Sequence, residues 1–300
     1  ARVFALLDPK QFESLFREWV DETFERVSGE VINIDGKSLS GTLKNYPRKT
    51  DPIHIVNAWA TESGLVLGQN KSHTKGLHER DQVLELLKLL HLKGSIVTMD
   101  AIGTTQSNCE EILAKKGDYV LAVKKNQRRT FDEIGPLMQE QDGETFETSE
   151  KNRSRKEKRT YKLIRPTKML IEKWPGIKSI GSVEVERSAP DVVRNGRARL
   201  KKTTETRYYI SSLPSRHIRK FAHAVRSHWS IENKRHWVLD VVFNEDGCRS
   251  AVENAAENFA LLRRIAFNIL NQDKTFKASK TNKRLRAGWD NKYLKQVIFR

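Results

Sequence analysis

Apolar positions change their spacing several times along the first half of the chain. Residues 7–27 place them at helical intervals, with Asp8 as N-cap and Pro9 in the first turn. Residues 30–41, 53–64 and 65–73 alternate apolar and polar positions, which predicts three strands. The same criteria predict helices at 79–92, 105–117 and 129–140 and strands at 94–103 and 118–126. The predicted order is therefore β-β-β-α-β-α-β-α, an α/β fold with a mixed sheet flanked by helices.

The pattern changes again after residue 140. Residues 141–207 contain four short apolar alternations, one of them at 169–174, and turn signals such as Pro-Gly and Asn-Gly, which predict a strand-rich insertion. Helical spacing returns at residue 215. Within this helical part Trp229 and Trp237 each follow a histidine, and we interpret both as core residues. The final segment, 271–300, is basic and polar and is expected to be loosely held.

Basic charge is concentrated in two parts of the chain. The formal net charge is +17. Residues 151–220 hold 21 Lys and Arg against 6 Asp and Glu, and residues 271–300 hold 9 against 2, so the rest is slightly acidic. A solvated face produces such runs too, but two runs on either side of one acidic motif favour a polyanionic partner, most simply nucleic acid.

Cysteine content and hydropathy restrict the class of protein further. Cys109 and Cys248 are the only cysteines, and their separation suits neither a disulfide framework nor a zinc site. This usage is typical of the cytoplasm. No apolar stretch reaches the roughly 18 residues that a membrane span requires.

Two aspartates come at the ends of predicted strands. Asp35 ends the first strand and Asp100 ends the apolar strand at 94–103. Either alone is as well explained by a turn or a cap. If the two strands are neighbours, however, their carboxylates repel each other unless a cation lies between them, and hard divalent cations prefer oxygen ligands. Glu232 is the candidate third ligand. The alternative interpretation is that Glu232 is an exposed helix residue paired with Arg235 or His236.

Five stretches resemble the H-repeat-associated transposases, insertion-sequence enzymes of the Asp-Asp-Glu (DDE) class. They are INIDGKSLSG, IVTMDAIG, DYVLAVKKNQ, RYYISSL and RSHWSIENKRHWVLDVVFNED. The similarity runs in order from about residue 3 to residue 270, and its most specific part is the block HWSIENKRHWVLDV at 228–241. The resemblance implies a ribonuclease-H-like mixed sheet flanked by helices, with a β-strand-rich insertion before the last catalytic helix.

Domain boundaries follow from the same resemblance. Residues 1–29 are a helical lead-in, interpreted as the end of a truncated N-terminal segment. Residues 30–140 and 208–270 form the ribonuclease-H-like catalytic domain, 141–207 form the basic β-rich insertion, and 271–300 form a basic C-terminal tail.

The resemblance also implies a reaction and the residues that perform it. The reaction is metal-dependent DNA strand cleavage and strand transfer, with Asp35, Asp100 and Glu232 as catalytic residues that hold Mg²⁺, for which Mn²⁺ can substitute. Seven residues are expected to contact DNA, namely Lys37, Lys124, Lys125, Asn126, Arg226, His228 and Lys234. The expected partners are double-stranded DNA, as element ends and as target, and a second copy of the chain in a homodimeric synaptic complex.

Two other functions are open on the sequence alone. A catalytically decayed transposase remnant needs only the basic surfaces and would bind DNA without cutting it. A ribonuclease-H-like nuclease would use the same carboxylates and would cut DNA without joining strands. Metal-dependent cleavage separates the first alternative from a transposase, and product analysis separates the second.

Overall fold

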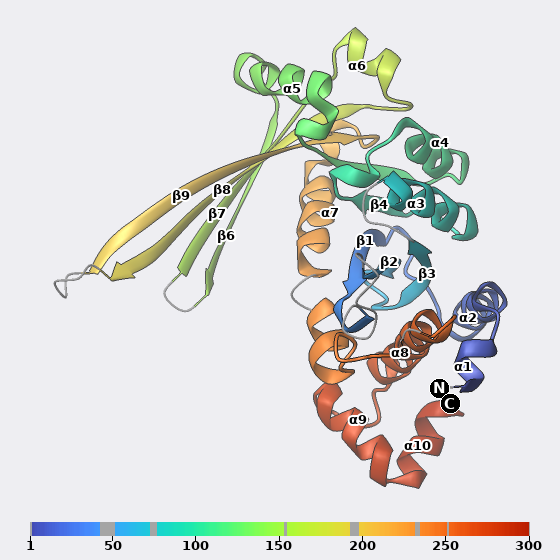
Figure 1. Cartoon of the computed structure of the whole chain (residues 1–300). Helices are drawn as coiled ribbons and strands as arrows, with labels where there is room; N and C mark the ends of the chain where they lie inside the picture. Colours follow the sequence, from blue (N-terminus) through green and yellow to red (C-terminus); the bar gives the residue numbers. More distant parts are fainter. Residues whose placement is uncertain are drawn as a thin grey trace. The chain divides into compact units, whose positions relative to one another are not determined.

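The computed structural model describes residues 2–42, 52–72, 77–152, 155–192, 198–231, 235–250 and 252–299. The predicted site residues Glu232 and Lys234 lie outside these ranges. The chain forms two compact units, residues 1–95 with 227–300, and residues 96–226 (Figure 1).

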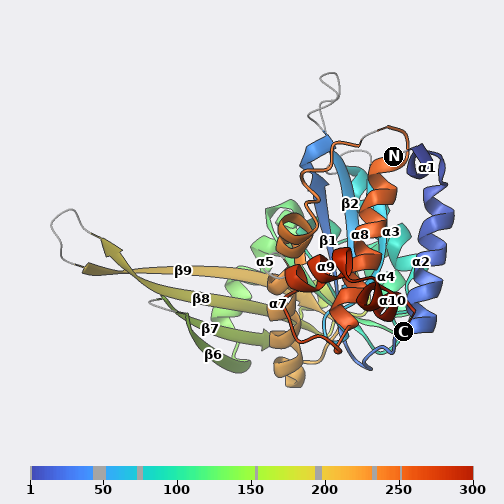
Figure 2. The same cartoon turned by 90° about the horizontal axis from the view of Figure 1, so that it is seen from below.

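The first unit is built on three antiparallel strands with helices on both faces (Figure 2). β2 is the central strand, and Asp35 on β1 lies opposite Asn57 on β2. Phe267 of α8 packs edge-on against Trp59, with ring centroids 5.3 Å apart, while Leu86 of α3 approaches the other face at Gly68. The elements are α1 (Arg2–Leu6), α2 (Pro9–Thr23), β1 (Val31–Leu39), β2 (Ile53–Ala60), β3 (Val66–Ser72), α3 (Leu77–Leu89), a π-helical turn (Val238–Val242), α8 (Ala255–Gln272), α9 (Lys280–Trp289) and α10 (Asn291–Ile298).

The predicted start of α2 is confirmed. Asp8 is the N-cap, and its Oδ1 accepts hydrogen bonds from the backbone N–H groups of Lys10 and Gln11, both at 2.9 Å. Pro9 occupies the first helical position, where the missing N–H costs nothing. Local sequence therefore determines where this helix begins.

The C-terminal segment is ordered, contrary to the expectation that it is loosely held. It forms α9 and α10, and Asp273 anchors both. The Tyr293 hydroxyl donates to Asp273 Oδ2 at 2.8 Å, and Lys283 Nζ lies 3.3 Å from the same oxygen. The basic composition did not predict this anchor, because Lys283, which contacts Asp273, is buried and not solvated.

The second unit contains a six-stranded mixed sheet in the order β4-β5-β9-β8-β7-β6. β4 and β5 are parallel, and every other pair is antiparallel. The elements are β4 (Ile96–Met99), α4 (Gln106–Ala114), β5 (Asp118–Val123), α5 (Arg128–Glu140), β6 (Glu144–Asn152), β7 (Arg155–Ile164), α6 (Lys168–Lys173), β8 (Ser179–Val192), β9 (Ala198–Ser211) and α7 (Ile218–Ile231). The last residues of α7 belong to the first unit. Short 3-10 turns lie at Ala101–Gly103 and Lys125–Gln127. The predicted order of elements up to α5 and the strand-rich segment after it are thus confirmed.

Two local predictions are wrong. Residues 169–174, expected as a strand, lie largely within α6, because the Thr167 side chain caps the helix by accepting from the Leu170 N–H. Trp237, expected in the core, is 54% exposed. It lies just before the π-helical turn, where the ordinary helical period no longer applies. None of the helices in the described part of the chain has the length and hydrophobicity that a bilayer crossing requires.

Candidate active site

Asp35 lies half-buried on the face of β1 that α8 covers. Its side chain is 24% exposed. One carboxylate oxygen accepts the N–H of Gly36 at 2.9 Å, which fixes the rotamer, and the other lies 3.6 Å from Nε2 of His236. The cross-strand neighbour Asn57 points to the same face and accepts a hydrogen bond from Arg264 of α8.

His236 is a partly buried side chain that is neutral at physiological pH. Burial, reinforced by the cations of Lys37 and Arg264, lowers its pKa to about 4. Its Nε2 has no hydrogen-bond partner among the described residues. The contact with Asp35 therefore joins a carboxylate to a neutral imidazole, which can donate a hydrogen bond from Nε2 in one tautomer. At 3.6 Å the two groups are close but not hydrogen-bonded.

Lys37 contacts carboxylates and has little access to solvent. It is 8% exposed, and its Nζ lies 3.0 Å from Glu245 Oε2 and 3.5 Å from Asp246 Oδ1 and also contacts Asp240. Three acidic side chains therefore share one ammonium group. The expectation that Lys37 contacts DNA phosphates is not favoured, because its charge is already neutralised where it lies.

Glu245 and Arg264 connect this cluster to β2. Both are fully buried and hydrogen-bond to each other, and Arg264 Nε donates to Asn57 Oδ1 at 2.9 Å. Burial alone would raise the pKa of Glu245, but the charges of Arg264 and Lys37 outweigh it and lower the pKa. Because Asn57 lies opposite Asp35, this network braces the pair of strands that carries the candidate carboxylate.

The brace was not predicted from the sequence. Its one signal was the group of acidic residues at 240, 245 and 246 within a mostly basic half of the chain. Neither periodicity nor the family resemblance singled out Arg264, which reads as an ordinary helix residue.

Asp100 lies in the second unit, directly after the buried strand β4. Its side chain is 47% exposed, and Lys124 Nζ lies 2.8 Å from one of its oxygens and 2.9 Å from the other. Lys124 follows β5, which runs parallel to β4, so both residues lie at the carboxyl ends of neighbouring strands. Ligands commonly bind at such strand ends in open sheets.

The turn after β5 supports the turn that begins at Asp100. Asn126 Nδ2 donates to the Ala101 carbonyl at 2.9 Å, and Gln127 Nε2 donates to the carbonyls of Ala101 at 2.6 Å and Thr104 at 3.0 Å. The structure thus brings three predicted residues, Asp100, Lys124 and Asn126, into one cluster. Lys125 is exposed beside them. Asn126 has a structural role there, whether or not it also contacts DNA.

The remaining predicted residues are located differently. Arg226 forms a two-pronged contact with Glu150, with Nε and Nη2 lying 3.2 and 2.8 Å from the two carboxylate oxygens. His228, in the last turn of α7, is half-buried. Among the residues that the structure describes, no group of three or more His, Cys, Asp and Glu side chains could hold a metal ion.

The donor chemistry around the candidate carboxylates suits a hard divalent cation. Carboxylate oxygens are the ligands that Mg²⁺ and Mn²⁺ prefer. Both oxygens of Asp100 already contact a cation, the exposed ammonium of Lys124. The two described candidate residues, Asp35 and Asp100, are thus of the ligand type that such an ion prefers.

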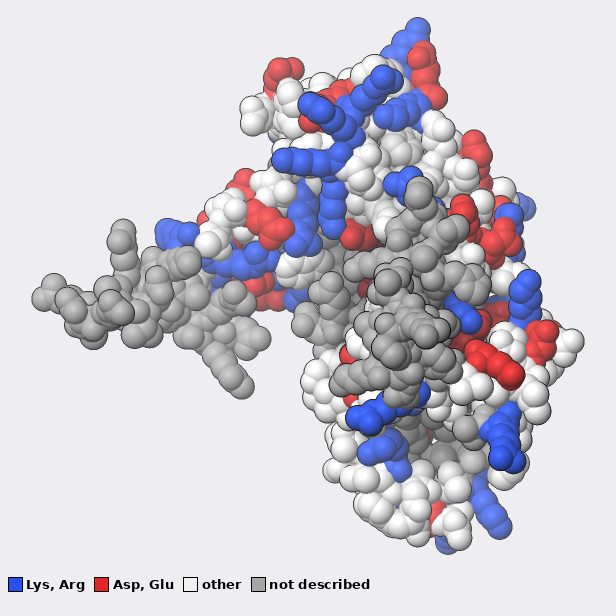
Figure 3. Space-filling model, in the orientation of Figure 1, with Lys and Arg blue, Asp and Glu red and all other residues white. Residues whose placement is uncertain are grey.

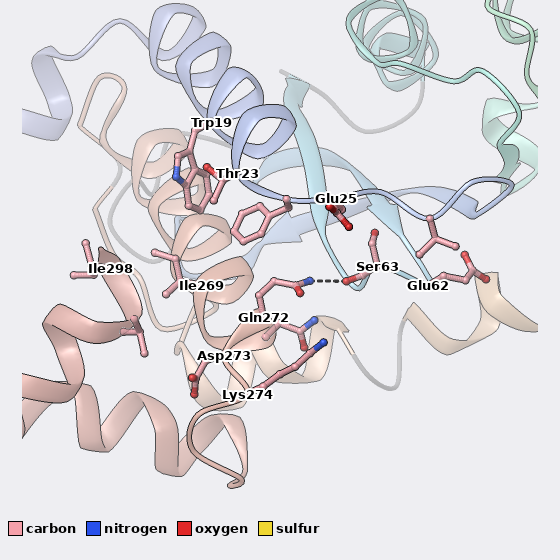
Figure 4. Close-up of a pocket in the computed structure, with 14 residues that line it drawn as sticks. Trp19, Thr23, Glu25, Glu62, Ser63, Ile269, Gln272, Asp273, Lys274 and Ile298 are labelled. Carbon is pink, nitrogen blue, oxygen red and sulfur yellow. Dashed lines mark hydrogen bonds between the residues drawn. The ribbon is translucent and has the colours of Figure 1, made fainter. Parts of the chain in front are cut away.

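A cavity of roughly 720 Å³ lies in the first unit and contains none of the predicted site residues (Figure 4). It is lined by the end of α2, the turn around Ser63, the end of α8 and the end of α10. Gln272 Nε2 donates to the Ser63 carbonyl at 2.6 Å across it. Its lining mixes apolar and charged side chains without paired catalytic groups, so it is not the candidate active site.

Comparison with known proteins identifies the class to which this site belongs. The sequence profile of the transposase DDE domain matches residues 26–269. The chain belongs to this family and is a DDE transposase, an enzyme that acts on DNA and depends on divalent metal ions.

Individual relatives agree with the family. The chain is 38% identical over 308 residues to the "H repeat-associated putative transposase YhhI" of Escherichia coli K12, covering 99% of this chain and 79% of that protein. It is 36% identical over 307 residues to the "Putative transposase YncI" of Escherichia coli O157:H7, covering 99% and 76%. A solved piggyBac transposase synaptic complex with hairpin DNA overlaps 91% of this chain and 57% of that chain, at 13% identity and a TM-score of 0.37, an overlap too low to define the fold.

Proposed function

We propose that the chain catalyses metal-dependent cleavage and strand transfer of an insertion sequence, with Asp35, Asp100 and Glu232 as its catalytic carboxylates. The observation that carries the proposal is the match of residues 26–269, which include all three acids, to the transposase DDE domain. The sites of the two described acids agree with this role. Asp35 lies on a braced strand pair, and Asp100 ends a parallel strand beside an exposed cation.

The three carboxylates would hold Mg²⁺, with Mn²⁺ as a substitute. When bound, such ions activate a water or a DNA 3′-hydroxyl as nucleophile and stabilise the leaving oxygen of an in-line displacement. His236 lies beside Asp35, and the buried network through Glu245 keeps the β1–β2 pair rigid. Lys124, once released from Asp100, is placed to contact a DNA phosphate next to the reacting group.

A row of lysines on the second unit supports a DNA contact outside the reaction centre. Lys151 lies opposite Lys156 on β7, Lys156 lies opposite Ser188 on β8, and Ser188 lies opposite Lys202 on β9. Directly opposed residues share one face of a sheet, and like charges placed in this way repel each other. A phosphate backbone along this row relieves the repulsion. Figure 3 shows further Lys and Arg side chains over α5 and α6, at the top of the view.

The proposal extends to fold, domains and partners. A ribonuclease-H-like catalytic domain formed by 30–140 and 208–270, interrupted by the insertion 141–207, is supported by the antiparallel β1–β2–β3 set and the later parallel pair β4–β5. Two copies of the chain would pair the two element ends in one synaptic complex. The action on DNA and the presence of only two, widely separated cysteines favour the cytoplasm.

A cleavage and joining assay tests the proposal. The protein is mixed with double-stranded DNA carrying element ends, with Mg²⁺, Mn²⁺ or a chelator. Asp35→Asn, Asp100→Asn and Glu232→Gln are each expected to abolish cleavage and to leave DNA binding largely intact. Asp132→Asn is the matched control, because Asp132 is a 62% exposed carboxylate on α5.

Each outcome decides between functions. Cleavage that persists in one of the three variants removes that residue from the site. Cleavage without joined products identifies a nuclease, and DNA binding without cleavage identifies a decayed remnant.

A further inference from the structure

α7 is fastened to the inserted sheet at three points. Phe221 is fully buried and packs edge-on against the rings of Tyr161 and Tyr209, with centroid distances of 6.5 and 5.6 Å. The Arg219 guanidinium lies over the Phe146 ring, 4.8 Å from its centroid. The third point is the two-pronged contact of Arg226 with Glu150.

Two of these points show that α7 runs along β6. Arg219 and Arg226 are seven residues apart on the helix, a rise of about 10 Å. Their partners Phe146 and Glu150 are four residues apart on β6, a rise of about 13 Å. The similar lengths and the same order along both segments mean that helix and strand run in the same direction. We call the two contacts clasps: Arg219–Phe146 is the first clasp, and Arg226–Glu150 is the second.

The second clasp belongs to an alternating chain of ion pairs on the same face of the sheet. Glu150 also contacts Arg159 at 3.3 Å, and Arg159 continues the chain to Glu157. The remaining contacts are Arg187–Glu157 at 3.3 Å, Arg187–Glu205 at 2.9 Å and Arg207–Glu205 at 2.7 Å. The Arg226 cation therefore ends a network whose other members are fixed on four strands.

Residue order connects this network to the reaction. α7 runs unbroken from Ile218 to Ile231, and the next residue in the sequence is Glu232. We propose that Arg226 is a positioning residue, and that the Arg226–Glu150 clasp sets where α7 delivers the segment that begins at Glu232. This inference rests on the proposed role of Glu232 as a catalytic carboxylate. It replaces the expectation that Arg226 contacts a DNA phosphate.

The two roles of Arg226 predict opposite behaviour of Glu150. If Arg226 binds phosphate, removal of the Glu150 charge releases it and leaves DNA affinity equal or higher. If Arg226 positions α7, Glu150→Gln lowers the cleavage rate at saturating DNA by about tenfold, since small displacements of catalytic groups cost up to about 10²-fold. The dissociation constant for DNA stays unchanged in this case.

Charge reversal and a matched control sharpen the test. Arg226→Glu alone should be as slow as Glu150→Gln or slower, and Glu150→Arg combined with Arg226→Glu should recover most of the rate. Glu147→Gln is the control, because Glu147 lies on the same strand with similar exposure, and its lysine partner, Lys158 at 2.8 Å, is on β7 and not on α7. It should cleave at the wild-type rate.

Hydrogen exchange of the backbone amides of residues 222–231 separates failure of this inference from failure of the proposed function. Faster exchange in Glu150→Gln, with slower cleavage and restoration of both by the reversed pair, supports positioning. Unchanged exchange, or faster exchange with wild-type cleavage, overturns it. Weaker DNA binding by Arg226→Glu that the reversed pair does not restore also overturns it, in favour of a phosphate contact. If the wild-type chain does not cleave DNA at all, the proposed function fails, and the positioning role of Arg226 fails with it. The exchange data then still report whether the Arg226–Glu150 contact holds α7.

Discussion

Charged side chains lie in different surroundings in the two units of this transposase. In the first unit, Arg264 and Glu245 have no exposed surface, and Lys37 is 8% exposed. In the second unit, lysines such as Lys156 and Lys158 lie exposed on open strands. A buried pair is costly to break and little affected by salt, whereas exposed charges add little to stability and are accessible to a polyanion.

The same contrast applies to the two described candidate carboxylates. Asp35 lies on a strand pair braced by buried charges, so its position is set before any ligand arrives. Asp100 is about half-exposed, and its cation is the exposed side chain of Lys124. One candidate acid is thus held by buried charges, and the other lies at the surface beside an exposed cation. Three stability measurements test this contrast between buried and exposed charge.

The largest effect is expected from breaking the buried Arg264–Glu245 pair. Arg264→Met leaves Glu245 buried and without its main partner, which should lower the free energy of unfolding by about 3–5 kcal/mol. Urea denaturation followed by circular dichroism measures this loss. Arg207→Met, in the partly exposed network of the second unit, should cost less than about 1 kcal/mol. Equal losses in the two variants would contradict the contrast.

An intermediate effect is expected at Asp273, where burial alone would raise the pKa. Hydrogen bonds from Thr275 and Tyr293 and the charge of Lys283 outweigh burial and lower the pKa to about 2. A carboxylate with a lowered pKa stabilises the fold above its unfolded value of 3.8 and loses this contribution as the pH falls through about 2. Asp273→Asn should therefore melt at a lower temperature than wild type at pH 5 and above.

The difference in melting temperature should shrink between pH 4 and pH 2 and disappear at lower pH. Thermal denaturation across this range measures it, with Asp132→Asn as an exposed control. A difference that is constant with pH would mean that Asp273 anchors α9 and α10 without its charge.

Sequence reasoning succeeded where neighbours in sequence decide the structure. The Asp8 cap, the β1 alternation and the apolar strand before Asp100 all depend on residues close together in the chain. α6 was missed because six residues give too short a period to separate helix from strand. The short turn after β5 was found only as a cluster of basic residues, not as a support for Asp100.

Contacts between residues distant in sequence are what the sequence could not predict. The sequence predicts a DNA contact at Lys37, because this lysine follows the candidate catalytic residue Asp35 by two positions. Its carboxylate partners Asp240 and Glu245 are 203 and 208 residues away in the chain. Arg226 similarly meets Glu150 across 76 residues. A single sequence gives the type of charge at each position, but only the fold decides which opposite charge meets it.

The smallest change in stability is expected from the lysine row, where the effect should appear in DNA binding instead. Lys156 has Lys151 opposite it on β6, and Ser188 separates it from Lys202 on β9, so Lys156→Gln removes repulsion. It should change the free energy of unfolding by no more than about 0.5 kcal/mol, because surface substitutions rarely do more. DNA affinity should fall, and the slope of log K against log salt should become shallower by about 0.9 for each phosphate that the protein no longer neutralises.

Fluorescence anisotropy with labelled DNA over a series of salt concentrations measures the slope. Lys88→Gln is the control, because Lys88 is a 48% exposed lysine on α3 in the first unit, outside the row and outside the basic side chains over α5 and α6. A Lys156 variant that is destabilised by more than about 1 kcal/mol would contradict the view that the exposed lysines of the second unit are not needed for its fold. An unchanged slope would mean that the DNA does not contact Lys156. A lysine that neutralises a phosphate releases counterions from the DNA, so removal of such a lysine must reduce the salt dependence of binding.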